Sequence, residues 1–424
     1  MPGNPIIFRP GALRGSVGVP GDKSISHRAL IIGACCAQPL RIAGLNPGRD
    51  VRATREALRA LGIAIEDDGS VVTVLPGRLQ SPSTTLDCMN SGTTARMLLG
   101  ACAGAGVRAR FDGDGSLRRR PMEPACAQLR AFGAKIETTN GHLPARLDGT
   151  PQIETRHFIL LSPSAQVKSA LLLAGLYAGV EVRVDGDRGS RDHTERLLEY
   201  LGCEVERTAR SVGLGTGKPT GGEIGVAGDF SAAAFFITAA ALTPGSDLLV
   251  RDVGVNPTRT GLLEALRMMG AELRLRNERT RFGEPVADVA VVARPLVGAA
   301  IGPDVALRAI DEIPLLAIAA ASAQGTTTIS GVADLRSKES DRIAAIERLL
   351  GAAGAGVTYE RGVLRIAGDA RGGRDGLVTT GGDHRIAMAA AVLGCALGPI
   401  TVDETASVAV SFPGFLERLG ALRA

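Results

Sequence analysis

One structural plan recurs six times along the 424-residue chain. Each copy begins with a polar, often serine-containing stretch, continues as an apolar helix of small residues, passes a glycine and ends in a β-rich run. The starts lie roughly 70 residues apart, so six copies account for the whole length. The pattern predicts six similar βαβ-like repeats, centred on residues 23–45, 90–114, 164–187, 228–254, 311–332 and 382–404.

Each repeat also contains a second helix of a different kind. Its apolar residues recur at three- and four-residue spacing and a glycine lies near its end, which is typical of a helix with one solvent-facing side. The first helix is apolar nearly all round, as expected for a helix enclosed by sheet. The second helices are expected within residues 49–66, 121–137, 191–206, 257–275, 338–357 and 412–422.

Six such repeats fit either a six-fold ring or two domains of three repeats each. An ordinary doubly wound sheet is the alternative, but its core helices need no polar chemistry at their starts. The stretch GEIGVAGDFSAAAF in the middle of the chain indicates a change of domain around residues 228–230.

Composition narrows the classes of function. Aromatic residues make up 3% of the chain and the net charge is +4, so neither a nucleic-acid coat nor an aromatic ligand cage is expected. The seven cysteines form no CxxC pair and no zinc pattern, which favours reduced thiols in a cytoplasmic protein. We find neither a signal peptide nor an apolar run of membrane-spanning length.

Basic residues gather at the starts of the apolar helices. A helix N-terminus carries a positive partial charge, so several starts that face one space would trap an anion. Arginine grips phosphates and carboxylates with two parallel hydrogen bonds, which indicates a ligand with several negative charges. The helix starts carry Lys23, Arg28, Arg96, Lys168 and Arg385, with Ser24, Ser91 and Ser164 as expected caps, and nearby segments add Arg120, Arg191 and Arg342.

Two acidic positions suggest proton transfer. Asp311 and Glu312 begin an apolar helix, and Glu339 lies between Lys338 and Arg342. A carboxylate held near an anionic ligand can reach a pKa useful for acid–base catalysis. No HExxH, GxxxxGK[ST] or GxSxG motif occurs, and no cysteine is placed as a nucleophile. Acid–base chemistry without a metal, on an anionic substrate, is therefore the expectation.

Eight motifs carry a resemblance to a known family. In order, they are GDKSISHRAL, NSGTTARM, DGDGSLRRRPM, SAQVKSALL, SRDHTERL, IDEIPLLA, LRSKESDRI and DHRIAMA. Together they closely resemble the 5-enolpyruvylshikimate-3-phosphate synthase family, and SAQVKSA and RDHTE resemble its second bacterial subclass. The enolpyruvyl transferases that act on UDP-N-acetylglucosamine are similar in general plan, but their catalytic cysteine loop has no counterpart here.

The resemblance implies an α/β fold of two domains with three βαβαββ units each, helices buried inside the sheets, and two crossovers. The domains would be residues 21–229 and residues 1–20 plus 230–424, with the active site in the cleft between them. It further implies a cytoplasmic monomer that needs no cofactor or metal and binds small substrates rather than nucleic acid or membrane.

The family reaction transfers the enolpyruvyl group of phosphoenolpyruvate to the 5-hydroxyl of shikimate 3-phosphate. The resemblance implies Asp311 as proton acceptor and Glu339 as proton donor, with Lys23 a rival for the second role. Phosphoenolpyruvate would be bound by Lys23, Gly92, Arg120, Gln166, Arg342 and Arg385. Shikimate 3-phosphate would be bound by Lys23, Ser24, Arg28, Ser164, Ala165, Gln166, Arg191, Asp311 and Lys338.

Three positions bear on the details of that site. Val410 stands where many family members have a lysine, so one phosphate contact is absent or supplied elsewhere. Ala165 replaces a serine and offers only its backbone. Gly92 leaves room that an alanine would take from the inhibitor glyphosate, so we expect inhibition that competes with phosphoenolpyruvate and weakens in Gly92→Ala.

Two rival functions stay open at this stage. One is an enolpyruvyl transferase that uses another acceptor alcohol. The other is a non-catalytic ring of six repeats that binds a polyanion by its helix ends, although the low aromatic content disfavours single-strand binding.

Overall fold

The computed structural model describes residues 5–149, 153, 155–370, 372 and 376–423. The chain forms two compact domains. The first domain is Gly21–Val226 with Thr280–Glu284, and the second is Met1–Pro20, Ala227–Arg279 and Pro285–Ala424. The chain therefore passes between the domains four times rather than the two expected, because the tip of one hairpin packs with the first domain.

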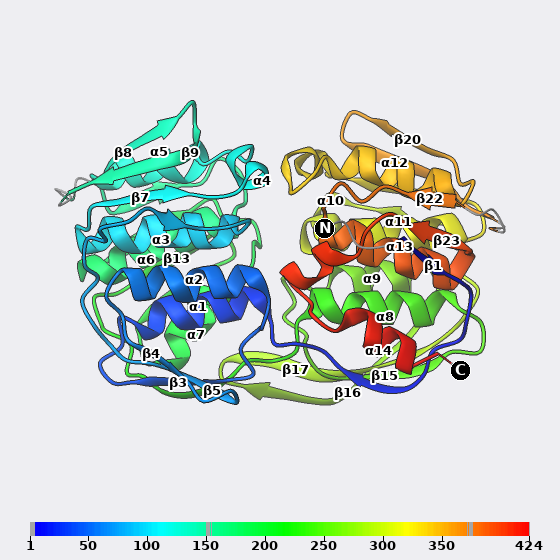
Figure 1. Cartoon of the computed structure of the whole chain (residues 1–424), viewed down its shortest axis with the longest axis horizontal. Helices are drawn as coiled ribbons and strands as arrows, with labels where there is room; N and C mark the ends of the chain where they lie inside the picture. The colour runs from blue at the N-terminus through cyan, green and yellow to red at the C-terminus, as the bar shows by residue number, and fades with distance from the viewer. Residues whose placement is uncertain (1–4, 150–152, 154, 371, 373–375, 424) are drawn as a thin grey trace. The chain divides into compact units, whose positions relative to one another are not determined.

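Three buried helices form the centre of the first domain (Figure 1). They are α1 (Lys23–Gly33), α3 (Gly92–Ala105) and α6 (Ala165–Ala178). Three four-stranded sheets accompany them, with strand orders β14-β3-β5-β4, β6-β7-β9-β8 and β10-β11-β13-β12. The outer elements are α2 (Arg49–Ala60), α4 (Gly115–Arg118), α5 (Glu123–Phe132), α7 (His193–Tyr200), β3 (Leu40–Ala43), β4 (Ile65–Asp67), β5 (Val71–Val74), β6 (Leu86–Asp87), β7 (Ala109–Asp112), β8 (Lys135–Thr139), β9 (His142–Asp148), β10 (His157–Ile159), β11 (Val182–Asp185), β12 (Val205–Arg207), β13 (Ser211–Leu214) and β14 (Gly222–Gly225).

The second domain repeats this plan around three further buried helices. They are α8 (Phe230–Leu242), α11 (Ile313–Ser322) and α13 (His384–Leu397). Its sheets have the orders β16-β17-β15-β2, β18-β19-β21-β20 and β1-β23-β22. The other elements are β1 (Ile6–Phe8), β2 (Arg14–Gly18), β15 (Asp247–Gly254), α9 (Gly261–Met268), β16 (Glu272–Arg281), β17 (Glu284–Val292), β18 (Ala300–Ile301), α10 (Pro303–Arg308), β19 (Thr326–Ser330), the 3-10 helix η1 (Ala333–Ser337), α12 (Arg342–Ala352), β20 (Val357–Glu360), β21 (Val363–Ala367), β22 (Gly376–Val378), β23 (Ile400–Val402), the 3-10 helix η2 (Ala406–Val410) and α14 (Phe415–Ala421).

The six sheets share one pairing rule. In each, a parallel strand pair is joined to an antiparallel one, as in β14 with β3 and β3 with β5. The same holds for β22 with β23 and β23 with β1 in the three-stranded sheet. The predicted six-fold repeat and the two-domain fold class are thereby confirmed.

Small residues let the buried helices of the first domain approach closely. A Cβ atom at Gly100 would overlap the carbonyl oxygen of Ala170, and one at Gly104 would overlap that of Ala174. The helices α3 and α6 therefore pack backbone against backbone, as the alanine- and glycine-rich composition predicts. In the second domain, aromatic rings fill part of the core, with the centroids of Phe236 and Phe415 5.4 Å apart.

The tip of the β16–β17 hairpin is held by helix α7. The Nδ1 atom of His193 lies 2.7 Å from Oε1 of Glu284, and both side chains are buried. One face of α7 further along carries Tyr200, whose ring meets that of Phe282 edge to face at 5.7 Å. These contacts explain why residues 280–284 belong to the first domain.

The helix caps match the prediction at two of three positions. The hydroxyls of Ser91 and Ser164 accept hydrogen bonds from the first turns of α3 and α6. The expected cap at Ser24 is wrong, because Asp22 accepts the hydrogen bond from the backbone of Ile25 instead. An aspartate two residues upstream satisfies the same orphan donor, which leaves Ser24 inside the helix.

Candidate active site

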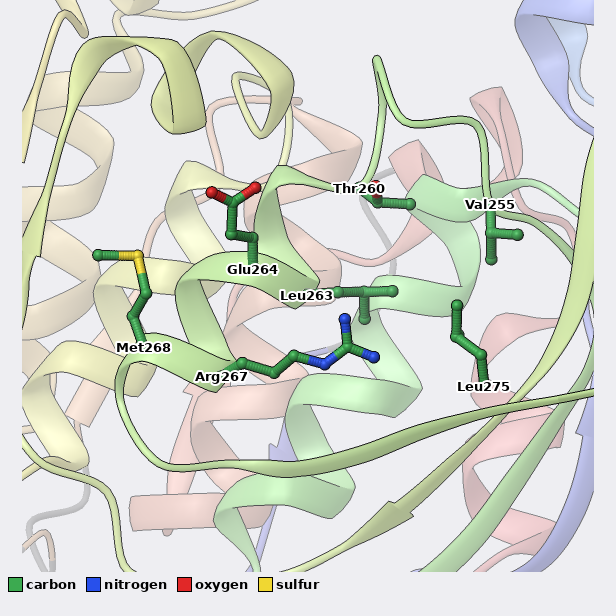
Figure 2. A pocket seen from close by; sticks show the side chains of 7 residues that line it. All are labelled: Val255, Thr260, Leu263, Glu264, Arg267, Met268 and Leu275. Carbon is green, nitrogen blue, oxygen red and sulfur yellow. The ribbon is translucent and has the colours of Figure 1, made fainter.

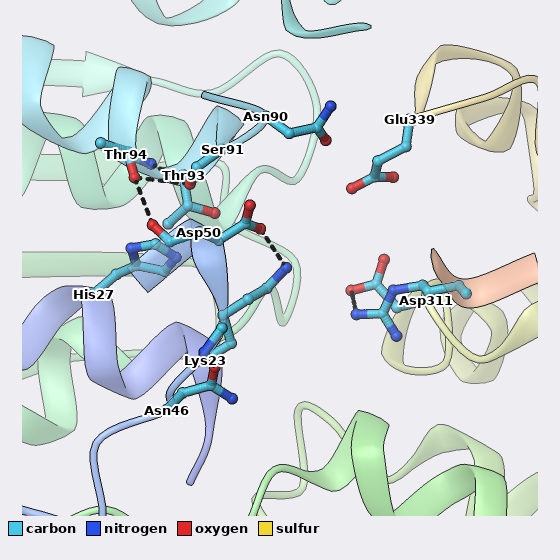
Figure 3. Close-up of polar contacts among 12 residues, drawn as sticks. Lys23, His27, Asn46, Asp50, Asn90, Ser91, Thr93, Thr94, Asp311 and Glu339 are labelled. Atoms are coloured by element: carbon cyan, nitrogen blue, oxygen red, sulfur yellow. Dashed lines mark hydrogen bonds and ion pairs between the residues drawn. The ribbon is translucent and has the colours of Figure 1, made fainter. Parts of the chain in front are cut away.

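Helix α1 of the first domain begins with Lys23, whose ammonium group forms an ion pair. Its Nζ atom lies 2.7 Å from Oδ2 of Asp50, the second residue of α2 (Figure 3). The lysine side chain keeps 16% of its surface exposed. Lys23 is therefore held in place at a helix start and still reaches solvent, as a substrate-binding cation must.

Helix α3 begins at Gly92, and the arginine one turn later links two helices. Nη1 of Arg96 donates to Oε1 of Gln166 on α6 at 2.7 Å, and Nη2 donates to the carbonyl of Pro121, also at 2.7 Å. The amide of Gln166 in turn donates to the Thr93 hydroxyl at 3.0 Å. The predicted ligands Gly92 and Gln166 thus lie beside one another, joined through Arg96.

Arg120 lies at the same end of the first domain. Its Nη2 atom donates to the backbone oxygen and to Oδ1 of Asn90, at 2.9 and 2.5 Å. A Cβ atom at Gly92 would lie 3.4 Å from Nη1 of this arginine. The structure therefore brings Arg120, Gly92 and Asn90 together before helix α3.

Arg28 lies deeper than a surface ligand would. Its exposed fraction is 2%, and its guanidinium donates to Thr194, to the backbone of Ser24 and to Ser169. Burial lowers the pKa of Arg28 to about 10. These three bonds use three of its five N–H groups, so Arg28 also joins α1 to α6 and α7.

Lys168, which the helix-start pattern groups with the anion-binding cations, is buried and paired with two carboxylates. The side chain is 1% exposed and its Nζ atom lies 2.6 Å from both Asp187 and Glu195. Burial opposes the charge, but the two carboxylates outweigh it and raise the pKa of Lys168. Two neighbours that are distant in sequence therefore neutralise this cation, and Glu195 is its partner rather than a simple dipole residue.

The remaining predicted ligands of the first domain keep part of their surface accessible. Ser164 caps α6, Ala165 is the first residue of that helix, and Arg191 lies just before α7; all three are half-buried. Ser24 is likewise half-buried in the first turn of α1.

Arg342 organises the carboxylates of the second domain. It is fully buried, with Nε 3.0 Å from Asp383, Nη2 2.6 Å from Glu339 and Nη1 3.5 Å from Asp311. Burial would raise the pKa of Asp383, but the guanidinium of Arg342 outweighs it and the net pKa is lowered. The same carboxylates raise the pKa of Arg342 against the opposing effect of its burial. The two predicted proton-transfer residues, Asp311 and Glu339, thus share one arginine.

A second arginine, Arg385 on α13, reaches the same group. Its Nη2 atom lies 3.6 Å from Asp311 and its Nη1 atom 3.8 Å from Glu312, which is almost fully buried. Arg259 hydrogen-bonds to Ser231 at 2.7 Å, and the Ser231 hydroxyl donates to Glu312. The starts of α8, α11 and α13 are therefore linked by charged groups.

The last predicted residues of this domain keep part of their surface exposed. Lys338 follows η1 and is half-buried. Val410 ends η2 and is also half-buried.

Motif reading missed four residues of these clusters, namely Asp50, Asn90, Arg259 and Asp383. For three of these residues, the sequence contains a feature that could have indicated a site residue. Asp50 lies in the first turn of a second helix, Asp383 is the residue before an apolar helix, and Asn90 begins the NSGTTARM motif. Arg259 gave no signal beyond its position before a helix.

A pocket of about 460 Å³ opens elsewhere in the second domain, beside α9 and β16 (Figure 2). Its lining includes Val255, Glu264, Arg267 and Met268, and none of the predicted site residues. Among the described residues, no group of three or more His, Cys, Asp and Glu side chains is arranged to hold a metal ion. None of the described helices has the length and apolar character that crossing a membrane requires.

The fold is one that solved enolpyruvyl transferases share. The solved enolpyruvyl transferase NikO from Streptomyces tendae has the same fold, with a TM-score of 0.76 over 99% of this chain and 98% of that one, at 20% identity. The chain belongs to the EPSP synthase (3-phosphoshikimate 1-carboxyvinyltransferase) family, whose pattern it matches over residues 7–419.

Individual relatives are similar over nearly their whole length. The 3-phosphoshikimate 1-carboxyvinyltransferases of Anaeromyxobacter sp. (strain K) and Syntrophotalea carbinolica are each 45% identical, over 97% and 100% of this chain and 94% and 100% of theirs. The EPSP synthase structure from Acinetobacter baumannii matches with a TM-score of 0.86 and 40% identity, covering 99% of this chain and 98% of that one.

Proposed function

We propose that the two domains together perform the reaction of the EPSP synthase family. In it, the enolpyruvyl group of phosphoenolpyruvate moves to the 5-hydroxyl of shikimate 3-phosphate and phosphate is released, a step of chorismate and aromatic amino-acid biosynthesis. The observation that carries the site assignment is the arrangement of Asp311 and Glu339 around the buried Arg342.

The reaction is an addition followed by an elimination. A proton must reach the methylene carbon of phosphoenolpyruvate while the 5-hydroxyl loses its proton and attacks the neighbouring carbon. In our proposal Asp311 accepts the hydroxyl proton and Glu339 donates to carbon, with Lys23 as the competing donor. The tetrahedral intermediate then expels phosphate, which fixed cations stabilise.

The cations of both domains bind phosphoenolpyruvate in this proposal. Lys23, Arg120 and the Gly92 backbone come from the first domain, and Arg342 and Arg385 come from the second. The two arginines of the second domain already contact carboxylates at 2.6 to 3.8 Å. Phosphoenolpyruvate therefore has to share or exchange these partners, which couples substrate binding to the positions of Asp311 and Glu339.

Shikimate 3-phosphate is bound mainly by the first domain. A phosphate and a carboxylate suit the half-buried serines and Arg191 at the starts of α6 and α7. The proposed set is Lys23, Ser24, Arg28, Ser164, Ala165, Gln166 and Arg191, with Asp311 and Lys338 from the second domain.

Because both substrate sets draw on both domains, we place the reaction in a cleft that forms where the domains meet. Closure around the substrates would exclude water, which otherwise diverts the intermediate and weakens each electrostatic contact. Small-angle scattering with and without shikimate 3-phosphate tests this, and an unchanged radius of gyration with both the substrate and glyphosate bound would contradict it.

Phosphate release tests the function and separates its rivals. We expect release that requires both substrates and a product whose mass equals that of shikimate 3-phosphate plus the enolpyruvyl group. Transfer to a different alcohol with shikimate 3-phosphate inert would favour the other-acceptor transferase. Binding of polyanions without any phosphate release would favour the ring-like clamp.

We further propose a cytoplasmic monomer. The seven cysteines are all free thiols, and burial raises the pKa of Cys36 to about 12 and of Cys126 to about 11. Such thiols are unreactive and suit a reducing compartment. Sedimentation velocity checks the monomer, and a mass of two chains at micromolar concentration would overturn it.

A further inference from the structure

A chain of buried side-chain hydrogen bonds runs behind Lys23 in the first domain. Nδ1 of His27 lies 2.7 Å from the Thr54 hydroxyl, which lies 2.7 Å from the Thr94 hydroxyl. The Thr94 hydroxyl contacts Oγ of Ser91 at 2.8 Å and the backbone oxygen of Asp50 at 3.3 Å. Figure 3 shows His27, Ser91 and Thr94 near the Lys23–Asp50 ion pair. We call these three residues, His27, Thr54 and Thr94, the relay.

The relay joins three helices within their first two turns. His27 lies on α1, Thr54 on α2 and Thr94 on α3, and all three side chains are fully buried. A hydrogen bond in a buried site is strong, and losing one partner leaves the other unsatisfied. The relay therefore helps to fix the mutual position of the three helix starts, together with the Lys23–Asp50 ion pair.

The bonds run in one direction through the relay. We assign the hydrogens from the single proton of each hydroxyl: Thr94 donates to Ser91 or to the Asp50 carbonyl, Thr54 then donates to Thr94, and Nδ1–H of His27 donates to Thr54. Burial, reinforced by Lys23 and Arg28 and opposed by Asp50, lowers the pKa of His27 to about 3. The imidazole stays neutral in the working range, and its Nε2 atom has no hydrogen-bond partner in the described part of the chain.

Two groups that bind phosphoenolpyruvate in the proposed function depend on these helix starts. Asp50, which holds the ammonium of Lys23, lies at the start of α2, and Gly92 follows the capping Ser91 at the start of α3. We infer that His27 and Thr54 are positioning residues, which set the separation of Lys23 and Gly92 so that both meet one phosphoenolpyruvate molecule. This inference rests on the proposed function.

The alternative is that the relay only stabilises the fold. The two accounts predict different effects of a mild substitution on the kinetics of the folded enzyme. A positioning role changes the KM for phosphoenolpyruvate and kcat, because the ligand contacts shift, whereas a stabilising role changes only the folded fraction and the melting temperature.

The test is Thr54→Val, which keeps the side-chain shape and removes the hydroxyl. We expect kcat/KM for phosphoenolpyruvate to fall about 10-fold or more per folded molecule, with the KM for shikimate 3-phosphate changed less than about 2-fold. Thr54→Ser, which restores the hydroxyl, should recover kcat/KM to within about 3-fold of the wild type.

Thr238→Val is the matched control in the second domain. Thr238 is equally buried, on α8, and its hydroxyl has no hydrogen-bond partner among the described residues. We expect unchanged kcat and KM values. Equal kinetic losses in Thr54→Val and Thr238→Val, or a Thr54→Val enzyme with wild-type constants and only a lower melting temperature, would overturn the inference.

NMR spectroscopy can observe the protonation state and tautomer of the relay histidine directly. The chain has five histidines, so ring-nitrogen NMR can assign the tautomer of His27 by comparison with His27→Asn. We expect an Nδ1–H tautomer that does not titrate between pH 8 and pH 5 and whose signal shifts in Thr54→Val. A His27 that titrates above pH 6, or an Nε2–H tautomer, would overturn the inference.

Failure of the inference and failure of the proposed function can be told apart. If wild-type enzyme releases no phosphate with both substrates, the function itself fails. If the wild type is active and Lys23→Met loses phosphoenolpyruvate binding, but Thr54→Val is kinetically normal, only the relay inference fails.

Discussion

The two domains share one fold but differ in the groups that link the starts of their buried helices. In the first domain, neutral hydroxyls and a neutral imidazole link α1, α2 and α3 beside a single ion pair, Lys23–Asp50. In the second domain, the starts of α8, α11 and α13 are linked by arginines and carboxylates, with Glu312 between Arg259 and Arg385. The repeat therefore places polar groups at the helix starts of both domains, but the charge of these groups differs between the domains.

This difference separates two tasks. Arg28, Arg96 and Arg120 of the first domain donate to hydroxyl, amide and backbone oxygens. The second domain pairs Arg342 with carboxylates that can exchange protons. In our proposal, the first domain mainly holds the anionic substrates, and the second moves protons near them.

The largest expected effect comes from breaking the charged cluster with Arg342→Met. Asp383 would be left buried without its cation, which costs about 3–5 kcal/mol of unfolding free energy at pH 7, and activity should fall at least about 1000-fold. Urea unfolding and phosphate release measure the two effects.

The pH dependence of stability tests the same cluster. In the wild type, the lowered pKa of Asp383 gives stability above its unfolded pKa that is lost as pH falls through the folded value. In Arg342→Met the uncompensated carboxyl takes up a proton more readily, so the deficit should shrink from pH 7 to pH 5. The double variant Arg342→Met/Asp383→Leu should recover most of the stability, and a double variant as unstable as the single one would contradict the account.

The next effect concerns packing, with Gly100→Ala in the first domain. The new Cβ atom would overlap a backbone carbonyl of α6, so we expect a loss of about 3 kcal/mol, measured by urea unfolding. Gly351→Ala on α12 is the control, since no described atom lies within 4 Å of its Cβ position and alanine favours a helix. Similar losses of unfolding free energy in both variants would contradict the close backbone contact between α3 and α6.

The sequence carries the repeat, the buried helices and the motif residues, because periodicity and local capping are local properties. The sequence does not show which anionic partner each cation contacts. Lys168 and Lys23 occupy the same kind of place, yet Lys168 contacts two carboxylates, Asp187 and Glu195, and Lys23 contacts one. No local pattern indicates the partners of Lys168, which lie 19 and 27 residues away. The partner of Arg342, Asp383, is farther still at 41 residues.

The relay predicts a pH dependence of moderate size. The folded pKa of His27 is about 3 and the unfolded value about 6.5, so stability is full above pH 6.5 and is lost as pH falls toward 3. Between pH 8 and pH 5 the wild type should lose about 2 kcal/mol through this group alone. In His27→Asn, or His27→Gln if the first variant does not fold, this part of the slope should vanish. Parallel stability curves for variant and wild type would contradict the burial of a neutral imidazole.

The smallest expected effect is that of Gly92→Ala. The new methyl group would lie 2.6 Å from Nη1 of Arg96 and 3.4 Å from Nη1 of Arg120, so the flexible arginine ends must move. We expect glyphosate to inhibit the wild type in competition with phosphoenolpyruvate, and the inhibition constant to rise about 10-fold in Gly92→Ala, with a smaller rise in the KM for phosphoenolpyruvate. A wild type that is insensitive at millimolar glyphosate would refute this.

The central claim is that both domains contribute indispensable groups to one reaction. The direct measurement is phosphate release from phosphoenolpyruvate, with and without shikimate 3-phosphate, for the wild type, for Lys23→Met of the first domain and for Asp311→Ala of the second. The account predicts release by the wild type only with both substrates, and a fall of at least about 1000-fold in each folded variant. Release without shikimate 3-phosphate, or near-normal rates in either variant, would contradict it.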